Sequence, residues 1–531
     1  MHIDCGDHPC SVSSRLLPLL VALAALVGLT VAGPAAGAGA KRPATLLQLT
    51  AAAACTERVA LLGAGARELD GALRLWRLDG PRTQALVTGL RSRKSVAFAQ
   101  RERTYEVAAT SETPDPLQAD EWWLGQVGLE GQVAPGPGVP ITIVDSGLDL
   151  THPEFAGRAD TVTLNAQEPT PFGGEHGTMV ASVIGAPLNG VGLVGIYPRA
   201  VIRSWDAAKG AGTRLESSEI AGGILAAARA GKSVINLSLG SDTRDVAIEL
   251  AVQDAVATGS LVVAASGNDG DRGNPIGYPA ALPHVTTVAA TNRAGAVAGF
   301  SSRSSYVDIA APGDDILVAS ALGRNWRATS GTSFSSPLVA GAAAWIWTVR
   351  PELTAGQVAE ILRRSARDIA PVGRDAASGF GMLNVAAALA LTPPINDLYE
   401  PNDDIEEVSP SGDRYLSKAP SLTTKSRRSG RAAGRVDMNE DPRDVYRLWL
   451  PAGRTVTATI RSTTDGDLQL FSGTAVSVTG RFASGRLANA STRGINERLR
   501  FVNRKAGRWA YLVVKLPQGT FDATYNLSVA S

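Results

Sequence analysis

Cysteine is scarce in this sequence, which contains only Cys5, Cys10 and Cys55 among 531 residues. The first two precede a hydrophobic leader, so removal of that leader would leave Cys55 as the only thiol. An exported chain could then form no intrachain disulfide. We therefore expect the stability of the exported protein to come from packing or from bound ions.

The chain also has almost no net charge, because 51 Lys and Arg residues are balanced by 50 Asp and Glu residues, for a formal charge of +1. Binding to nucleic acid or to an anionic membrane surface is usually marked by an excess of basic residues. The composition predicts neither partner and leaves protein or peptide substrates open. The length of the chain indicates about three structural units rather than one core.

Long apolar runs are confined to residues 16–32, which follow Arg15 and lead into the small residues AAGAGA. This pattern is typical of a bacterial-type signal peptide and predicts a secreted, extracellular protein, with a periplasmic or surface-attached location as the variant. The alternative is an uncleaved anchor, although about 17 residues is at the lower limit for crossing a bilayer. After signal removal we expect no membrane attachment. Cleavage could follow Ala36, Ala38 or Ala40.

A hydroxyl nucleophile, a base and a carboxylate occur in suitable places along the chain. The segment GTSFSSP (331–337) places Ser333 in a small-residue turn at the start of an apolar helix. A serine hydroxyl needs a base to take its proton, and the base needs a partner that fixes its tautomer. His176 lies at the start of a second helix in EHGTMVASVIG, and Asp145 ends the buried strand ITIVD.

Each of these residues also has an ordinary structural interpretation. An Asp after a strand, or an Asn before Gly, is usually a turn or cap residue. His176 has few rivals, because none of the other four histidines has a comparable context: His2, His8, His152 and His284. Together, the three motifs favour catalysis over the structural interpretation.

The motifs DSG, HGT and GTSxxSP, in this order, resemble those of the subtilisin-like serine proteases, or subtilases. The resemblance covers about half of the chain, residues 116–391. It implies that Ser333 is the nucleophile, His176 the general base and Asp145 its orienting partner. Asn268, in the segment LVVAASGNDG, matches the family's oxyanion asparagine.

The match to the family pattern has two departures in the helix after HGT. Met179 stands where the commonest pattern has a second His, and Ser182 replaces a frequent Gly. Neither position supplies the chemistry, so the expected reaction type is unchanged while the rate could differ.

The resemblance also implies a substrate cleft in which an extended peptide pairs with the chain as an added strand. Small, uncharged walls favour a large apolar or aromatic side chain before the scissile bond, although Asp269 at the rim could also tolerate a basic one. The residues implied to bind substrate are Ser238, Leu239, Gly240, Ala265, Ser266, Gly267 and Gly277.

Strand and helix signals alternate through this region, in the order AVIRSW, SEIAGGILAAARA, VINLSLG, AIELAVQDAVATG and LVVAAS. Such alternation predicts an α/β domain with a parallel sheet, helices on both faces, and the triad at the carboxyl ends of strands. Pro279 matches a position that is often a cis proline in the family.

No organic cofactor is implied, but the resemblance allows a structural calcium ion. Glu154 and Asn189 match positions where a family calcium site draws ligands. Calcium needs six to eight oxygens, and only two side chains match. An ordinary loop is an equally good interpretation.

Between the signal (1–40) and the protease lies a segment, 41–115, that resembles in position the small α+β propeptide domain of many subtilases. Such a domain assists folding and occludes the cleft, which makes it a partner of the protease. The alternative is an extension that stays attached. We expect processing within 105–114, where Pro and polar residues favour an exposed loop. The predicted core residues of the segment are Trp76, Leu86, Val87, Leu90, Val96 and Phe98.

The last part of the chain changes character at an acidic, Pro-containing stretch, 392–404, which predicts a linker. Residues 405–531 contain short alternating strands typical of an all-β sandwich. YEPNDD, VYRLWLPAG, YLVVKL and YNLSV resemble the bacterial pre-peptidase C-terminal domain, which is commonly removed or used for attachment. The basic run 425–435 predicts a mobile, solvated loop. Three aromatic residues could form a binding face, with core favoured for at least half of them: Trp449, Trp509 and Tyr511.

The sequence therefore predicts a secreted serine endopeptidase, made as a precursor, that hydrolyses proteins through an acyl-enzyme. The alternative is a catalytically silent peptide-binding or adhesive protein on the same scaffold, against which the presence of all four chemical residues argues. One dedicated processing substrate and broad degradation fit the sequence equally, and the oligomeric state is left open.

Overall fold

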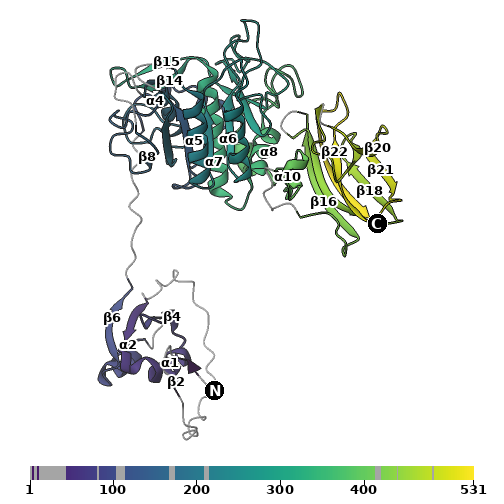
Figure 1. Ribbon diagram of the computed structural model, residues 1–531. Coiled ribbons are helices and arrows are strands. Elements are labelled where there is room, and N and C mark those ends of the chain that lie inside the picture. Colours follow the sequence, from purple (N-terminus) through teal and green to yellow (C-terminus); the bar gives the residue numbers. More distant parts are fainter. Residues whose placement is uncertain are drawn as a thin grey trace, which may run out of the picture. The chain divides into compact units, whose positions relative to one another are not determined.

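Figure 1 shows the computed structural model of the chain. Its described residues are 44–79, 83–102, 114–166, 174–208, 214–412, 420–438, 441–480 and 483–531, with two short strands, β1 (Ile3–Asp4) and β2 (Pro9–Cys10). The predicted leader and its cleavage sites lie outside them. The chain divides into two compact units, Met1–Ser111 and Glu112–Ser531. Among the described residues, no helix is both long and apolar enough to cross a membrane.

The first unit contains a four-stranded antiparallel sheet, in the order β4-β5-β3-β6, and two helices. Leu61 from one helix and Leu90 from the other pack against Leu47 and Trp76 of the sheet, which gives the predicted α+β unit its core. Cys55 takes part in a disulfide bond in the full-length chain, so the expectation of a disulfide-free protein applies only after processing. The elements are β3 (Thr45–Leu49), η1 (Ala51–Ala53), α1 (Ala54–Gly63), β4 (Arg67–Asp70), β5 (Leu75–Leu78), α2 (Thr83–Ser92) and β6 (Val96–Arg101).

Most of the predicted core of this unit is confirmed, but Phe98 is 39% exposed, so its assignment to the core is wrong. The pairing of β3 with β6 shifts register between Gln48 and Leu49. A bulge of this kind re-aims the side chains that follow it. Val96 and Ala99 therefore pack against the core, and Phe98 faces away from it.

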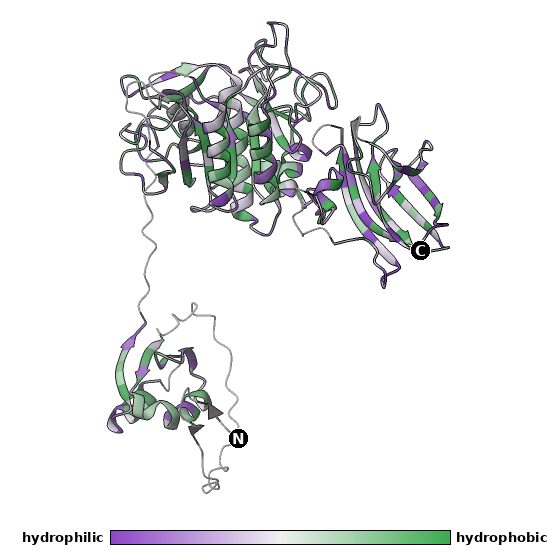
Figure 2. Ribbon diagram, in the orientation of Figure 1, coloured by the Kyte–Doolittle hydropathy of each residue, from purple (hydrophilic) through white to green (hydrophobic). Residues whose placement is uncertain are grey.

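The second unit begins with a seven-stranded parallel sheet in the order β13-β12-β11-β10-β7-β9-β8, as predicted for an α/β domain. Five of these strands, β7 and β10 to β13, are buried along their whole length, as expected of a sheet covered on both faces, and apolar residues of the sheet are green in Figure 2. The strands are β7 (Ile141–Asp145), β8 (Thr161–Thr163), β9 (Ile202–Asp206), β10 (Val234–Leu237), β11 (Leu261–Ala265), β12 (Val285–Thr291) and β13 (Ile309–Pro312).

Helices cover both faces of this sheet (Figure 1). On one face, α5 (Ser217–Arg229) and α6 (Val246–Ala257) contribute to a core that includes Ile224 and Val252. On the other, α4 (Glu175–Gly185), α7 (Thr332–Val349) and α8 (Ala355–Ser365) share a larger core. The Tyr278–Pro279 peptide bond is cis, as the resemblance implied. Smaller elements are η2 (Gln118–Asp120), α3 (Trp123–Gln126), β14 (Ile316–Ser320), β15 (Asn325–Thr329) and α9 (Val385–Ala390).

The remainder of the second unit, which we call the β-domain, contains two four-stranded antiparallel sheets, β16-β23-β18-β21 and β17-β22-β19-β20. Their inward-facing side chains form one core, and the all-β prediction is confirmed. Tyr511 is buried, while Trp449 and Trp509 are half-buried. The elements are α10 (Ile405–Val408), β16 (Ser429–Asp437), β17 (Arg443–Leu450), β18 (Thr455–Ser462), β19 (Asp467–Ser472), β20 (Arg486–Ala490), β21 (Asn496–Val502), β22 (Arg508–Lys515) and β23 (Asp522–Ala530).

The basic run 425–435 was predicted to be a mobile loop, and this prediction is wrong for most of its length. Strand β16 begins at Ser429 and pairs with β23 over nine residues. Its small and apolar residues alternate with Arg, so that Ala432, Gly434 and Val436 are buried. Arg435 is engaged in ion pairs with Glu360, Asp437 and Asp522 rather than solvated.

Candidate active site

The carboxylate of the site is fixed at the end of the central strand β7. Asp145 is 1% exposed, and its Oδ1 accepts a hydrogen bond from the Ser146 backbone N at 2.7 Å. The neighbours of β7 in the sheet are β10 and β9, so Asp145 lies where the strand order reverses. In open α/β sheets this position is where ligands bind.

The histidine of the site lies in the first turn of α4, directly against this carboxylate. His176 Nδ1 is 2.8 Å from Asp145 Oδ1 and 2.9 Å from Oδ2. Glycine is required next to it, because a Cβ on Gly177 would collide with the carbonyl oxygen of Gly147. The DSG and HGT motifs therefore pack backbone to backbone, which holds the two side chains together.

The electrostatics of the pair favour a protonated imidazole more than water does. Burial on its own would lower the pKa of His176. The charge of Asp145, its hydrogen bond and the charge of Glu175 outweigh that effect, so the pKa of His176 is raised above its ordinary value of 6.5. The imidazolium that forms during proton transfer would be stabilised in the same way.

The serine of the site is the second residue of α7. Ser333 Oγ lies 3.4 Å from the carbonyl oxygen of Ser238, and the ring of Phe334 packs 6.0 Å from that of His176. No hydrogen bond joins Ser333 to His176 among the described residues. Such catalytic hydrogen bonds are often long without substrate and shorten in the reactive complex.

A buried network positions Ser333, and sequence reasoning missed it. Ser238 Oγ donates to the Ser333 carbonyl at 2.8 Å, and Asn236 Nδ2 donates to Ser238 Oγ at 2.9 Å. Ser336 Oγ completes the chain by donating to Asn236 Oδ1 at 2.7 Å. The only sequence signal was the pair of serines that follows Phe334 in GTSFSSP; Ser336 of this pair has no partner until the fold places β10 beside α7.

Asn268 is held in one orientation by the residue before Ser333. Its Oδ1 accepts hydrogen bonds from the backbone N and from Oγ1 of Thr332, each at 2.9 Å. With the oxygen committed to these two donors, Nδ2 is the part of the amide left for a ligand. Thr332 was not identified from sequence as a positioning residue, because its hydroxyl acquires its role only in the folded chain.

A cavity of about 530 Å³ opens beside Ser333 and Asn268. A second cavity of about 580 Å³ adjoins Asp145 and His176 and includes Ile220, Tyr278 and Leu282. At the rim of the first, Asp269 pairs with Arg272 at 3.8 Å, and the side-chain preference of the cleft stays a prediction. All seven residues implied to bind substrate line the first cavity: Ser238, Leu239, Gly240, Ala265, Ser266, Gly267 and Gly277.

Both departures from the family pattern are accommodated inside α4. Ser182 Oγ donates to the Met179 carbonyl and accepts from Ala319 N at 3.0 Å, which ties α4 to β14. Met179 is buried, with its sulfur 3.4 Å from Arg327 Nη2. Neither side chain is in hydrogen-bond contact with the site described above.

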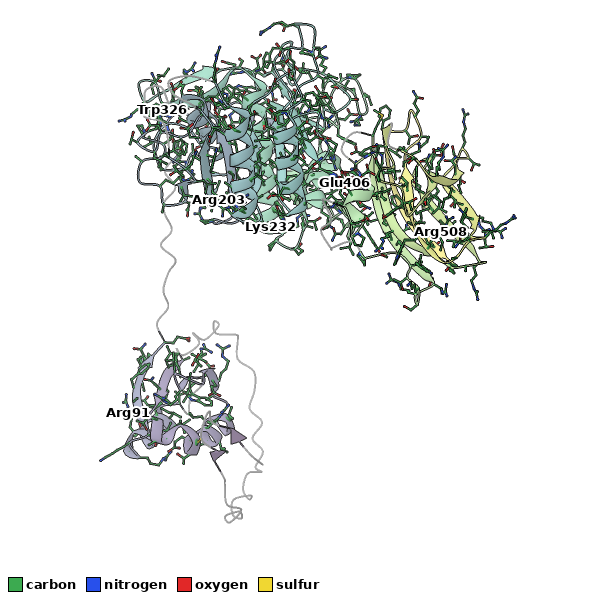
Figure 3. All side chains as sticks on the ribbon, in the orientation of Figure 1. Arg91, Arg203, Lys232, Trp326, Glu406 and Arg508 are labelled. Carbon is green, nitrogen blue, oxygen red and sulfur yellow. The ribbon has the colours of Figure 1, made fainter. Side chains whose placement is uncertain are left out.

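The loop after α4, in which calcium ligands were predicted, presents N–H groups to carboxylates. Three consecutive backbone N atoms from Asn189 onward donate to Asp115, and Glu154 Oε1 accepts from Leu193 N and from Trp326 Nε1 (Trp326 is labelled in Figure 3). Burial raises the pKa of Glu154 to about 7. N–H groups that point at an oxygen suit an anion more than a cation. Calcium at Glu154 and Asn189 stays a prediction.

Comparison with known proteins places this site in a family. Residues 136–381 match the family described as the Subtilase family. Subtilisin of Bacillus pumilus is 36% identical over 264 residues, which are 49% of this chain and 94% of that relative. The chain belongs to the subtilase family. Subtilisin E of Bacillus subtilis (strain 168) is likewise 36% identical over 264 residues, or 68% of its length.

Two solved structures are also similar to this chain. A structure described as S41 Psychrophilic Protease is 31% identical, covers 50% of this subtilase and 97% of its own chain, and has a TM-score of 0.43. Sphericase is 30% identical with the same two coverages and TM-score. As a member of this family, the protein is a serine-type endopeptidase.

Proposed function

We propose that this subtilase is a secreted endopeptidase, made as a precursor, that cleaves protein substrates through Asp145, His176 and Ser333. The observation that supports it most is the 2.8 Å contact between His176 Nδ1 and a buried Asp145, beside the helix that carries Ser333 in its first turn. That contact leaves the opposite ring nitrogen available to the serine. The intact set of chemical residues disfavours the alternative of a silent peptide-binding protein.

In the proposed reaction, Ser333 Oγ attacks the peptide carbonyl carbon while His176 Nε2 takes the hydroxyl proton. Asn268 Nδ2 and the Ser333 backbone N donate to the oxyanion. When the tetrahedral intermediate collapses, the C–N bond breaks and His176 passes its proton to the leaving amine. Water then attacks the acyl ester, His176 again takes a proton, and the acid product leaves as Ser333 recovers its hydroxyl. Apart from water, every step uses groups of this chain, with no organic cofactor.

The first unit would be the propeptide that is removed from the precursor. Its four-stranded sheet and two helices form a separate core, as expected of a domain that folds by itself and is then discarded. The predicted processing stretch falls almost wholly outside the described residues. Signal cleavage, secretion and removal of the β-domain are parts of the same proposal.

The pH dependence of cleavage tests the proposed role of His176. The ring must be neutral to take the serine proton, and its pKa is raised by Asp145. Activity should therefore be lost as the pH falls through a value above 6.5, the ordinary histidine pKa, and be fully present on the alkaline side. The measurement is kcat/KM of the processed enzyme on a peptide substrate across pH. An acid limb centred below 6.5 would contradict the assignment.

Asn268→Ala is expected to lower kcat by about a hundredfold to a thousandfold with KM nearly unchanged. This magnitude is taken from the same substitution class in subtilisin, a relative, and is not worked out from this structure. The reason is that Nδ2 would contact the oxygen only once it carries charge. Asn325→Ala, in an exposed hairpin strand, is the control. Steady-state kinetics measure kcat and KM separately. A rise in KM with kcat unchanged would assign Asn268 to ground-state binding.

A further inference from the structure

Charge is distributed unevenly along the chain, although its total is close to zero. Residues 112–420 contain 20 Lys and Arg against 34 Asp and Glu, whereas residues 421–531 contain 18 Lys and Arg against 8 Asp and Glu. The largest basic excess therefore belongs to the β-domain. A strong local excess of one sign points to partners of the opposite sign, even in a chain that is neutral as a whole.

The few acidic side chains of the β-domain contribute little to its surface. Asp522, which is half-buried, forms an ion pair with Arg435. Most of the basic side chains, in contrast, are exposed. Positive charge therefore dominates the described surface of this domain. Five of its eight acidic side chains are buried: Asp437, Asp441, Asp444, Asp467 and Glu497.

One face of the sheet β16-β23-β18-β21 carries four of the exposed basic residues. Side chains alternate along each strand, so that Ile460 and Leu499 point into the core while their neighbours face solvent, and polar and apolar residues alternate in Figure 2. We call the solvent side of this sheet the arginine face. Its charged members are Arg431 of β16, Arg461 of β18, and Arg498 and Arg500 of β21.

The register of the sheet sets these arginines in three neighbouring rows. Arg498 and Arg500 are two residues apart on one strand, which separates their Cα atoms by about 7 Å. Arg461 is about 7 to 8 Å from Arg498 on the neighbouring strand, and Arg431 is three strands away, or about 14 Å. The rows are Arg431, Ser528, Thr459 and Arg498; Ser429, Ala530, Thr457 and Arg500; and Ala433, Asn526, Arg461 and Asn496.

The charge of the arginine face is not compensated. In the part of the chain that the structure describes, none of its four guanidinium groups has an ion pair. Surfaces whose charges only serve solubility mix both signs, whereas these rows contain no Asp or Glu. Charges that only protect a sheet from edge pairing belong on edge strands, but Arg461 is on the internal strand β18.

The remaining side chains of the face decide which class of anion it suits. Single-stranded nucleic acid is usually held on aromatic side chains, and duplex DNA is read by an element that enters a groove; these rows offer neither. A lipid surface needs an apolar face, whereas Val502 is the one large apolar strand residue exposed here. Thr457, Thr459 and Asn526 instead offer hydroxyl and amide groups, which are partners for sugar hydroxyls.

We propose that the arginine face binds an acidic polysaccharide that lies extended across the strands. The planar guanidinium groups match the geometry of carboxylates, so several arginines would each hold a carboxylate of a different sugar. The Thr, Ser and Asn side chains between them would hydrogen-bond the sugar hydroxyls. Such docking would keep the attached protease on an acidic matrix or cell surface. This role goes beyond peptide cleavage and does not depend on it.

Binding of polygalacturonate, in which each sugar carries one carboxylate, tests the proposal. The protein is the full chain, kept intact by Ser333→Ala, and the labelled polysaccharide is titrated by fluorescence anisotropy at several salt concentrations. A chelator is present, so that divalent ions do not bridge the probe to the protein. Neutral dextran is the negative probe. No binding of polygalacturonate at about 0.15 M salt would overturn the proposal, because buried or paired contacts survive that screening.

Two double variants of this chain remove the same charge from different places. The face variant combines Arg461→Ser with Arg498→Ser. The control combines Lys425→Ser with Arg486→Ser, at two exposed residues that belong to the other sheet. Lys425 Nζ lies 5.1 Å from the ring of Trp449 in β17, and Arg486 is the first residue of β20. Thermal unfolding checks that each variant keeps its fold.

We expect the face variant to bind polygalacturonate at least about tenfold more weakly than the parent chain, with a less steep dependence on salt. The control should stay within about twofold of the parent. Equal weakening of the two double variants would show that binding follows net charge alone, and would overturn the arginine face as the site.

Other anionic partners are distinguished in the same titration. A DNA duplex and vesicles with an anionic lipid are compared with polygalacturonate at equal charge concentration and about 0.15 M salt. We expect polygalacturonate to bind best, because contacts to sugar hydroxyls are not screened by salt. If the parent chain binds DNA or vesicles more tightly, and the face variant loses that binding, the polysaccharide is overturned as the partner. A dimer that only the face variant loses, and that polygalacturonate does not disperse in sedimentation, would assign the face to a second copy of this chain instead.

Discussion

Ser333→Ala is expected to reduce kcat on a peptide substrate by about a millionfold while the fold is retained. This magnitude is that of the same change in subtilisin, a relative, and is not worked out from this structure. The hydroxyl contributes little to stability, because its one described hydrogen bond, to the Ser238 carbonyl, is long at 3.4 Å. Residual catalysis would come from the oxyanion donors and from binding alone.

Ser330→Ala is the matched control for this variant. Ser330 is exposed, lies three residues upstream in the same turn, and donates to Asp314 at 2.7 Å. We expect its kcat to remain within a few-fold of the wild type. Thermal unfolding of both variants shows whether the fold is kept. A Ser333→Ala enzyme that retains more than about a hundredth of the activity, with no contaminating protease, would remove the serine from the mechanism.

Asp145→Asn is expected to reduce kcat by about ten-thousandfold, a magnitude also known from triads of this kind. Asp145 accepts the Nδ1 hydrogen of His176 through both oxygens, at 2.8 and 2.9 Å. An amide at this place can offer an N–H instead, which favours the wrong imidazole tautomer. The substitution also removes the charge that raises the pKa of His176, so the remaining acid limb should move to lower pH.

The pH profile distinguishes this role from a merely structural one. Asp254→Asn, on the exposed side of α6, serves as the control and should leave both rate and profile unchanged. A destabilised but otherwise normal enzyme would lose activity with the acid limb in its original place. That outcome, or a loss smaller than about tenfold, would contradict the assignment of Asp145 as the partner of His176.

The sequence was sufficient to bring the candidate catalytic residues together because each one ends a strand or lies in the first turn of a helix, within a short motif. Asp145 is at the end of β7, and His176 and Ser333 are the second residues of α4 and α7. Since parallel strands bring their carboxyl ends to one edge, such residues meet without any knowledge of long-range packing. Asn268 follows the same rule, just after β11.

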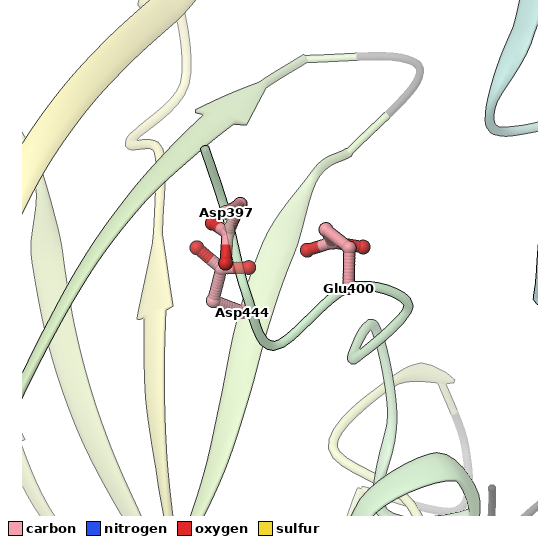
Figure 4. Close-up of side chains that lie close together, drawn as sticks. All are labelled: Asp397, Glu400 and Asp444. Atoms are coloured by element: carbon pink, nitrogen blue, oxygen red, sulfur yellow. The ribbon is translucent and has the colours of Figure 1, made fainter. Parts of the chain in front are cut away.

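What the sequence could not predict depends on partners distant in the chain. Thr332 holds Asn268 only because the start of α7 meets the loop after β11, and Asn236 contacts Ser336, which is 100 residues away in the sequence. Asp397, Glu400 and Asp444 are a further example, because their oxygens lie within 4.8 Å of one another although Asp444 is far from the other two in the sequence (Figure 4). The basic residues of β16 led to the wrong prediction of a mobile loop, because its Arg residues alternate with buried small residues.

The most direct test of the central claim is the intact mass of purified wild type and Ser333→Ala, each with and without a serine-directed fluorophosphonate. The account predicts that only the wild type loses its N-terminal segment and gains one adduct, on the peptide that contains Ser333. If both proteins stay full length and unlabelled while folded, Ser333 is not a working nucleophile and the proposed mechanism is contradicted.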